Sequence, residues 1–530
     1  MNSKYLKIGI AALALQMGLT SCERDLSEVH SSNTSSVVIY QDFSNYKGIL
    51  AKCYAGLALS GQEGGDGNAD IGGGDGGTFN YLRQYFQLQE LPTDEAIIAW
   101  GDANLPDLHN MTWGADNPFT MAMYYRILYQ VGIANEFIRE TTDEKLASRN
   151  ITGAQAEEAR EYRSEARFLR ALSYYHAIDM FGNVPFLDEN SPVGITPPPR
   201  IERKDLFTFL EKELKDLENQ LKAPRTNEYG RADRAAVWML LAKLYLNAEV
   251  YTGQAHYTEA ADYAKKVIDA GYSLKPKYEE LFLADNNLDN NEVIFSINFD
   301  GLHSQTWGGT TYIIHAAIGG SMPAADFGVN GGWGGLRTTK NLVQKFPDAH
   351  GNQDIRGRFF TNGQSYEIDN ISNFTDGYPL IKFKNVTRAG VAGKDPSLNF
   401  VDTDFPLFRL ADAYLMYAEA VLRGGNGNLT EALGYVNKLR ERAYGNTSGN
   451  IQASALTLNF ILDERARELA WEGSRRTDLI RFGQFTSDNY VWPWKGGVKD
   501  GKAVENFRTL YPIPSKDLIA NPNLIQNPGY

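Results

Sequence analysis

The sequence predicts a mainly α-helical protein built on repeated helix pairs, with a loop-rich insertion between them. Three observations lead to this fold class. The segment 238–245 (WMLLAKLY) places apolar residues at i, i+3, i+4 and i+7, which is one face of a helix. The segment 407–414 (LFRLADAY) has apolar residues at the same offsets. Residues 272–400, in contrast, hold many glycines, short alternating runs and few apolar stripes of helical length.

The first element is an apolar segment that ends at a cysteine. Two lysines precede the apolar run 8–19, Ser21 stands directly before Cys22, and Leu19 lies three positions before it. This layout is typical of a secretory signal that is too short to remain as a membrane span. It resembles a bacterial lipobox, so we expect residues 1–21 to be cleaved and Cys22 to carry the lipid anchor. The alternative is an ordinary signal peptide with an incidental cysteine.

Composition indicates a globular body with an acidic surface. The 530 residues exceed one simple core, so two or more lobes are expected. The formal net charge is −13, and loss of the two signal lysines makes it −15, which argues against a nucleic-acid partner. No later run approaches the ~20 apolar residues of a membrane span, so any membrane contact is expected through the lipid alone. Aromatic residues make up 12 % of the chain, which suits a surface that grips an uncharged, flat ligand.

The N-terminal part divides into a tether and a helical region. Residues 22–40 are polar and serine-rich and are predicted to be a tether, and residues 41–271 form the first helical region. Within that region lies the glycine-rich tract 61–78, which contains the spelling G-x-G-x-x-G at 72–77. No strand pattern leads into it, so a surface loop is a better interpretation than a dinucleotide site.

The helical stripes come in pairs that resemble the tetratricopeptide repeat. In each pair a stripe with a small residue at its centre is followed by an alanine-centred stripe, which lets the two helices approach closely. The first pair consists of Trp238, Leu241, Ala242 and Tyr245, followed by Tyr257, Ala260, Ala264 and Val267. The second pair consists of Leu407, Leu410, Ala411 and Tyr414, followed by Leu429, Ala432, Val436 and Leu439. A weaker copy is predicted at Ala166, Ala171 and Tyr174.

The region 272–400 is predicted to be an insertion of small β-hairpins and long loops that holds the ligand site. Its clearest strand is the alternating run 292–299 (EVIFSINF). Long loops on a rigid helical scaffold often carry binding residues. Residues 401–530 then complete the helical scaffold and the C-terminal region.

One stretch of the insertion has the spacing of a calcium loop. Oxygen-bearing side chains occupy alternate positions, as in such loops. They are Asp285, Asn287, Asp289 and Asn291. The stretch departs from the EF-hand at Asn290, where glycine is expected, and at Ser296, where glutamate is expected. Calcium binding and an asparagine-rich turn both remain open, and no other cofactor is expected.

Several segments together resemble the RagB/SusD family of outer-membrane lipoproteins. They include 90–100 (ELPTDEAIIAW), 469–483 (LAWEGSRRTDLIRFG), 491–497 (VWPWKGG) and 511–530 (YPIPSKDLIANPNLIQNPGY), and the likeness extends over essentially the whole mature chain. It is closest to the starch-binding member of the family. The resemblance implies a tetratricopeptide-based helical fold without catalytic activity. It also implies a lipid-anchored position on the surface of the outer membrane, where starch fragments are captured and passed to a SusC-type TonB-dependent transporter.

The resemblance also implies which residues contact the sugar. An arc of three aromatic rings would follow the curve of an α-glucan, with Trp307 in place of a tyrosine. The implied ligand-binding residues are Trp100, Trp307, Trp333, Arg83, Asn104 and, more loosely, Asp75. The loop after Trp100 is one residue short of the family pattern, so Ala103 is the alternative to Asn104.

Local sequence supports exposed indoles at these positions. Thr93 is predicted to cap a short helix that Gly101 ends, which places Trp100 at its C-terminus. Trp307 and Trp333 are each followed by two glycines, which are expected to leave the indoles uncovered.

Other chemistries have little support in the sequence. The seven histidines have no zinc-ligand spacing, and no G-x-S-x-G occurs. A pair of carboxylates for glycoside hydrolysis stays possible, although nothing singles one out. The leading hypothesis is an α-glucan-binding lipoprotein. Its rivals are a binder of a different neutral glycan and a tetratricopeptide scaffold whose ligand is a protein.

Overall fold

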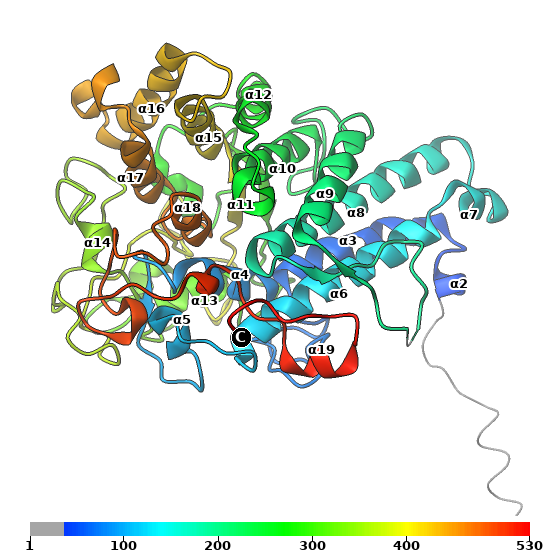
Figure 1. Ribbon diagram of the computed structural model, residues 1–530, viewed down its shortest axis with the longest axis horizontal. Coiled ribbons are helices and arrows are strands. Elements are labelled where there is room, and N and C mark those ends of the chain that lie inside the picture. The colour runs from blue at the N-terminus through cyan, green and yellow to red at the C-terminus, as the bar shows by residue number, and fades with distance from the viewer. Residues whose placement is uncertain (1–35, 195) are drawn as a thin grey trace, which may run out of the picture.

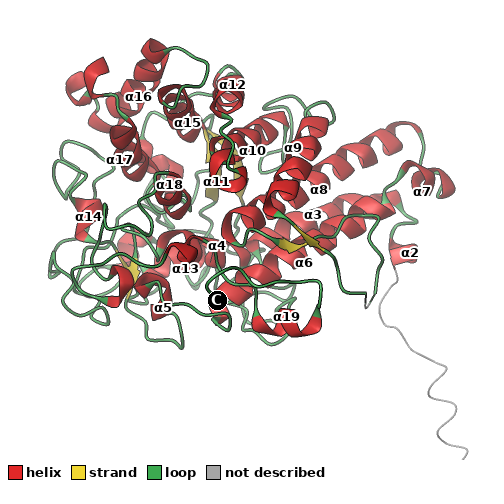
Figure 2. Cartoon of the chain, viewed as in Figure 1, coloured by secondary structure: helices red, strands yellow, loops and turns green. Residues whose placement is uncertain are grey.

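The computed structural model describes residues 36–194 and 196–530, a mainly helical chain with small strand pairs (Figures 1 and 2). The predicted mainly α-helical class is confirmed. The predicted signal peptide, Cys22 and most of the tether lie outside the described residues. The end of the tether forms the short helix α2 (Ser36–Ile39). Among the described helices, none has the length and apolar character needed to cross a membrane.

The N-terminal part is a layer of long helices. α6 packs along α8, and α3 and α9 pack against α8 (Figure 1). The elements are α3 (Tyr46–Ala58), α4 (Tyr81–Glu90), α6 (Pro118–Glu140), α8 (Gly153–Met180) and α9 (Arg203–Leu217). The side chains of Ala166, Ala171 and Tyr174, the weak third repeat, are buried in α8. The long helix α8 is therefore the central element of this layer, with α3, α6 and α9 packed against it.

The predicted repeat helices stack against one another. α10 (Arg234–Leu246) packs on α12 (Tyr257–Ile268), α12 packs on α15 (Leu410–Leu422), and α15 packs on α16 (Leu429–Tyr444). The alanines at the centres of these helices are fully buried, which allows the close approach. Thus two helix pairs that lie about 150 residues apart in sequence form one continuous stack.

The second repeat begins later than predicted. Leu407 lies in strand β6 (Phe405–Arg409), and α15 starts only at Leu410. β6 pairs antiparallel with β4 (Val293–Ile297), with Val293 opposite Arg409 and Ile297 opposite Phe405. The backbone hydrogen bonds of this pair override the helical spacing of Leu407.

The strands pair across long sequence separations. The predicted strand at 292–299 is confirmed as β4, but its partner is the distant β6 and not a neighbour in a hairpin. The same holds for β1 (Ile97–Ile98), which pairs with β5 (Leu336–Arg337). These two pairs, β4–β6 and β1–β5, attach the 272–400 insertion to the helical body. The third pair, β2 (Val184–Pro185) with β3 (Arg200–Ile201), is local and lies outside the insertion.

The predicted short helix before Trp100 is wrong. Thr93 Oγ1 donates to the carbonyl of Glu90 and closes a turn, and the chain then runs into β1. Asp94 is fully buried and pairs with Arg475 at 2.7 Å. This tertiary ion pair and the β1–β5 pairing fix an extended path that local propensity did not indicate, and Trp100 follows the strand in a loop.

The remaining helices are short or belong to the C-terminal part. They are α5 (Pro106–Asn110), α7 (Asp143–Ser148), α11 (Ala248–Thr252), α13 (Gly309–Ala316), α14 (Lys340–Val343), α17 (Leu458–Leu469), α18 (Arg475–Arg481) and α19 (Ser515–Ala520). α13 packs on α4, and α18 packs on α4 and α17. α13 and α4 therefore meet where the insertion joins the helical body (Figure 1).

Candidate functional site

An open cavity of about 450 Å³ lies where the glycine-rich loop, α4 and the loops around α13 meet. Its side chains come from segments far apart in the sequence. They are Asp66, Asp75, Arg83, Trp100, Trp307 and Trp333, and four glycines of the 61–78 loop complete the lining. The structure therefore brings together five of the six predicted ligand-binding residues.

The three indole rings form a continuous, curved row. The ring centroid of Trp333 lies 6.3 Å from that of Trp100, with 42° between the ring planes. On its other side, the centroid of Trp333 lies 6.1 Å from that of Trp307, with 51° between the planes. All three side chains are half-buried. Each outer ring is thus tilted against the central one, so the three faces do not form a single flat surface.

Each outer ring is fixed by a polar contact at its nitrogen. Trp100 Nε1 donates to the backbone carbonyl of Trp333 at 3.0 Å. Trp307 Nε1 donates to Asp66 Oδ1 at 2.8 Å, and its ring packs on that of Phe400 at 4.6 Å. Because the N–H groups are bound to protein, the rings offer their faces to a ligand.

The glycines beside the tryptophans also allow close packing of the chain. A Cβ on Gly335 would lie 2.7 Å from the ring of Trp100, and a Cβ on Gly308 would overlap the side chain of Asn80. Gly334 has φ +57°, a left-handed conformation that favours glycine. Gly335 and Gly308 are thus needed for close packing, and the prediction that the neighbouring glycines leave the indoles uncovered stays a prediction.

Arg83 presents a guanidinium without an acidic partner. Its backbone N–H is capped by Asn80 at the start of α4, and its guanidinium carbon lies 4.4 Å from the ring centroid of Tyr312. Within the described residues the guanidinium makes no hydrogen bond or ion pair, and its buried Nε has no partner. Burial lowers the pKa of Arg83, opposed by Tyr312 and by Asp75 and Asp102. A guanidinium keeps its proton under these conditions and has donors free for a ligand.

Asp75 supplies a carboxylate on the same wall. Its Oδ1 accepts hydrogen bonds from the backbone N–H groups of Gly77 at 2.9 Å and Thr78 at 2.8 Å. Burial alone would raise the pKa of Asp75, but the hydrogen bonds from Thr78 and Gly77 and the charge of Arg83 outweigh it and lower the pKa. The carboxylate is therefore ionised at neutral pH and accepts hydrogen bonds.

Asn104 does not reach the cavity. Its Nδ2 donates to Asp107 Oδ2 at 3.2 Å, and its carbonyl accepts a hydrogen bond from Asn117. Asn104 is not among the residues that line the cavity, and its φ of 67° is in the left-handed region. Ala103, the alternative, is exposed in the same loop. Asp102 is the residue of this loop whose charge acts on Arg83.

Four residues that contact the rings or Arg83 were missed by sequence reasoning. They are Asp66, Tyr312, His315 and Phe400. Asp66 stands between glycines in the 61–78 loop, which is a weak signal for a functional carboxylate. Tyr312 and His315 lie three residues apart on α13, a spacing that places both on one helix face. Phe400 has no local signal, because its role depends on tertiary packing alone.

The predicted calcium loop is crossed by an arginine. Arg388 Nε lies 3.1 Å from Asp285 Oδ2, and its Nη1 lies 3.2 Å from Asp289 Oδ2. Asn291 Oδ1 accepts a hydrogen bond from Arg225 at 3.0 Å. Across residues 36–194 and 196–530, no three histidine, cysteine or acidic side chains are grouped to hold a metal. Calcium binding here remains a prediction, and it requires Arg388 to leave the two carboxylates.

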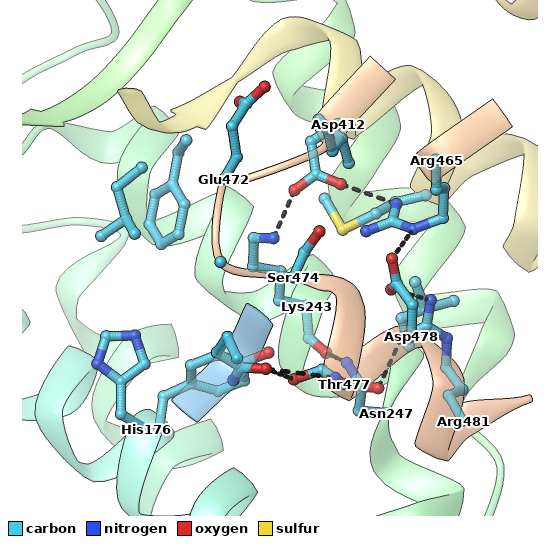
Figure 3. A pocket seen from close by; sticks show the side chains of 18 of the residues that line it. His176, Lys243, Asn247, Asp412, Arg465, Glu472, Ser474, Thr477, Asp478 and Arg481 are labelled. Atoms are coloured by element: carbon cyan, nitrogen blue, oxygen red, sulfur yellow. Dashed lines mark hydrogen bonds and ion pairs between the residues drawn. The ribbon is translucent and has the colours of Figure 1, made fainter. Parts of the chain in front are cut away.

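A second, enclosed cavity lies among α8, α10, α15, α17 and α18 (Figure 3). Its volume is about 30 Å³, enough for one or two waters. Its charged side chains pair with one another: Arg465 binds Asp412 at 2.8 Å and Asp478 at 2.7 Å, and Asp412 also binds Lys243. Burial lowers the pKa of His176 in this cavity to about 3, so the ring is neutral. The ion pairs around this cavity link the helices, and the cavity is too small for a sugar.

Comparison with known proteins gives further findings. The sequence profile of the SusD family matches residues 356–530. The chain is 36 % identical to "Starch-binding protein SusD" of Bacteroides thetaiotaomicron, over 100 % of both chains. It is 26 % identical to "SusD-like protein P2" of Formosa agariphila, over 80 % of this chain and 83 % of that one.

A solved structure shares the fold. Surface glycan-binding protein A from Bacteroides thetaiotaomicron, in complex with laminarihexaose, has a TM-score of 0.69 and 20 % sequence identity. The match covers 91 % of this chain and 99 % of that chain. At this identity the likeness concerns the fold alone.

Proposed function

This chain belongs to the SusD family, and on that premise we propose that it is a glycan-binding protein that captures starch and related α-glucans. The main support for the proposal is that Trp100, Trp307, Trp333 and Arg83 line one open cavity. The three indole rings lie next to one another in it. The relative that is 36 % identical over its full length is itself described as starch-binding.

The chemistry of the cavity suits a neutral sugar. Stacking the C–H face of a glucose unit on an indole removes on the order of 80 Å² of apolar surface from water, about 2 kcal/mol. Three rings together offset the several kcal/mol lost when a flexible chain is ordered. The unpaired donors of Arg83 and the carboxylate of Asp75 then bind sugar hydroxyl groups. The result is a site with moderate affinity for short chains and tighter binding to polymers.

The tilt between the rings supports a curved glycan. Successive indole planes differ by 42° and 51°, so a ligand that lies on all three faces must bend along its length. An α-1,4-linked glucan coils, whereas a flat β-1,4-linked chain would contact one ring only. A different curved neutral glycan, such as a β-1,3-glucan, is the rival ligand.

A glycan microarray probed with the purified chain tests the proposal directly. We expect signals from maltooligosaccharides and amylopectin and none from cellooligosaccharides. In native gels, amylopectin should retard the protein relative to a gel without polysaccharide. A laminarin signal without a maltooligosaccharide signal would reassign the ligand to a β-1,3-glucan. Absence of every glycan signal would favour the protein-binding scaffold.

We also propose that the chain binds without hydrolysing its ligand. The three rings and Arg83 supply contacts to the sugar, and one oxygen of each cavity-lining carboxylate, Asp66 and Asp75, is held by Trp307 Nε1 or by backbone N–H groups, so these acids are placed as hydrogen-bond acceptors. Incubation with amylopectin should release no reducing sugar above a buffer control. Release at a rate proportional to protein concentration would contradict this part of the proposal.

The proposed cellular role completes the assignment. We propose that Cys22 carries the lipid that anchors the chain at the outer-membrane surface, and that captured glycan passes to a SusC-type TonB-dependent transporter. The support is the N-terminal sequence pattern together with family membership. Cys22→Ala should abolish incorporation of labelled palmitate and release the protein from the membrane fraction. Affinity purification of the native protein should recover one outer-membrane transporter.

A further inference from the structure

His315 lies directly behind the central ring of the glycan site. Its side chain is 1 % exposed, near the end of α13. Its imidazole stacks on the indole of Trp333, with ring centroids 4.7 Å apart and only 18° between the planes. The backbone N–H of Trp333 also donates to the carbonyl of His315 at 2.7 Å. The position of Trp333 is therefore defined by His315 through both the ring and the backbone.

Both ring nitrogens of His315 contact backbone carbonyl oxygens. Nδ1 lies 2.7 Å from the carbonyl oxygen of Gly331, and Nε2 lies 2.9 Å from that of Asn399. A neutral imidazole donates from one nitrogen only, whereas the imidazolium donates from both. Burial lowers the pKa of His315, and the two carbonyl groups oppose that effect. A proton gained below the ordinary pKa of about 6.5 thus strengthens the bridge between the two carbonyls.

The two carbonyls belong to segments that hold different rings. Gly331 lies two residues before Trp333, and Asn399 directly precedes Phe400, on which the ring of Trp307 packs. The carboxylate of Asp395 accepts the backbone N–H groups of Asn399 and Phe400, each at 3.0 Å, and so keeps this turn rigid. A bridge at His315 consequently connects the support of Trp333 to the support of Trp307.

Few charged groups lie on the segments that surround the imidazole. The residues 309–316, 331–335 and 395–400 contain one acidic side chain, Asp395, and no lysine or arginine. Asp395 directs its oxygens at Ser397 and the backbone N–H groups of its own turn. From α13 the nearest titratable neighbour in sequence is Tyr312, which packs under Arg83. The proton at His315 is therefore governed by the two carbonyls and by burial.

We propose that His315 is a positioning residue of the glycan site, which sets the separation and tilt of the Trp333 and Trp307 rings and thereby selects glycans of matching curvature. The inference rests on the proposed function as a glucan binder. His315 does not line the cavity, so it acts through the two indoles and makes no sugar contact of its own.

His315→Phe is the sharpest variant, because it keeps a flat ring under Trp333 and removes both hydrogen bonds. His350→Phe is the matched control, since His350 is exposed and lies outside the site. Calorimetry with maltoheptaose and with α-, β- and γ-cyclodextrin measures affinity and preference for curvature together. We expect His315→Phe to weaken maltoheptaose binding about fivefold. We also expect it to reduce the differences in affinity among the three cyclodextrins. His350→Phe should keep the affinities of the unmodified protein.

A spectroscopic measurement on the unmodified protein gives an independent readout. A stacked imidazolium quenches indole fluorescence, so emission should fall in a step at a pH below the ordinary imidazole pKa of about 6.5, because burial lowers the pKa of His315. Trp333→Phe should lose the step. Absence of the step in the unmodified protein would overturn the inference even if His315→Phe failed to fold.

The outcomes distinguish a failure of the positioning role of His315 from a failure of the proposed glucan binding. If Trp333→Ala weakens glucan binding while His315→Phe keeps the unmodified affinity and cyclodextrin ranking, the positioning role is wrong and the glucan assignment stands. If the unmodified protein binds none of these glucans, both proposals are wrong.

Discussion

The indole N–H of Trp100 donates a hydrogen bond to the backbone carbonyl of Trp333, across 3.0 Å. The two residues stand 233 positions apart in the chain. This contact couples the positions of two rings that form one side of the cavity. It also occupies the polar edge of Trp100, so that the apolar face is what remains for a ligand. The site is thus a set of mutually supported platforms, and substitutions at its supports should act on binding.

Replacement of the central ring should weaken binding most. Trp333→Ala removes one stacking face, and we expect a loss of about 2 kcal/mol, roughly 30-fold in affinity for maltoheptaose by calorimetry. Trp238→Ala is the control, because Trp238 is half-buried on α10, away from the cavity. Equal affinities for the two variants would show that the sugar does not lie on Trp333.

Arg83→Met tests the unpaired guanidinium. The variant keeps the length of the side chain and removes the donors, so affinity should fall about tenfold, as for a lost hydrogen bond to a charged group. The melting temperature should change little, because within the described residues no acid pairs with Arg83. Arg160→Met, which removes an exposed arginine paired with Asp143, should leave binding intact. A large drop in melting temperature with full affinity would assign Arg83 to stability instead.

Gly335→Ala tests the close packing behind Trp100. The added methyl would lie 2.7 Å from the indole, so the ring must move and affinity should fall several-fold. Gly114→Ala is the control outside the site, because a Cβ there meets no atom within 4 Å. Binding isotherms give the glucan affinity of both variants. An unchanged affinity for Gly335→Ala would show that binding does not depend on the exact position of Trp100.

The pH dependence of stability should report a buried carboxyl pair. Burial raises the pKa of Glu95 to about 7, and burial and the neighbouring Glu95 raise the pKa of Glu90 well above its ordinary value. Between about pH 4.5 and 7 the folded chain therefore binds protons that the unfolded chain has lost, and stability falls as the pH rises. In this pH range a proton lies between the carboxyl groups of Glu90 and Glu95. In Glu90→Gln the amide N–H replaces that proton as the hydrogen-bond donor to Glu95.

Urea unfolding at pH 5 and pH 8 measures this effect. We expect Glu90→Gln to reduce the loss of unfolding free energy between the two pH values by on the order of 1 kcal/mol. Glu63→Gln, at an exposed position, should leave the loss unchanged. Identical losses in the unmodified protein and in Glu90→Gln would mean that the pair is not the source.

The helical scaffold could be predicted because it depends on short-range periodicity. The stripe from Trp238 to Tyr245 lies in α10, and its partner lies in α12, as the spacing indicates. The strand at 292–299 was also visible, whereas its pairing with 405–409 was not, since nothing local specifies a partner more than a hundred residues away. Leu407 was misplaced for the same reason.

Five residues of the site could be named from sequence, but their supports could not. Asn104 lies outside the cavity lining, and its amide is bound to Asp107, a contact that the sequence alone does not specify. The turn before Trp100 was mistaken for a helix because the partner of Asp94 lies in α18. Contacts of this kind become visible only when distant segments are placed together.

The pairing of Asp94 with Arg475 has a consequence for biogenesis. The carboxylate of Glu95 accepts the backbone N–H of Trp471, so the stretch leading to Trp100 rests on residues that leave the ribosome near the end of synthesis. A chain that stops before residue 471 leaves two acidic groups in the interior without counterparts. Prematurely terminated chains should therefore lack a working stacking surface, and only full-length translation products would bind glycan.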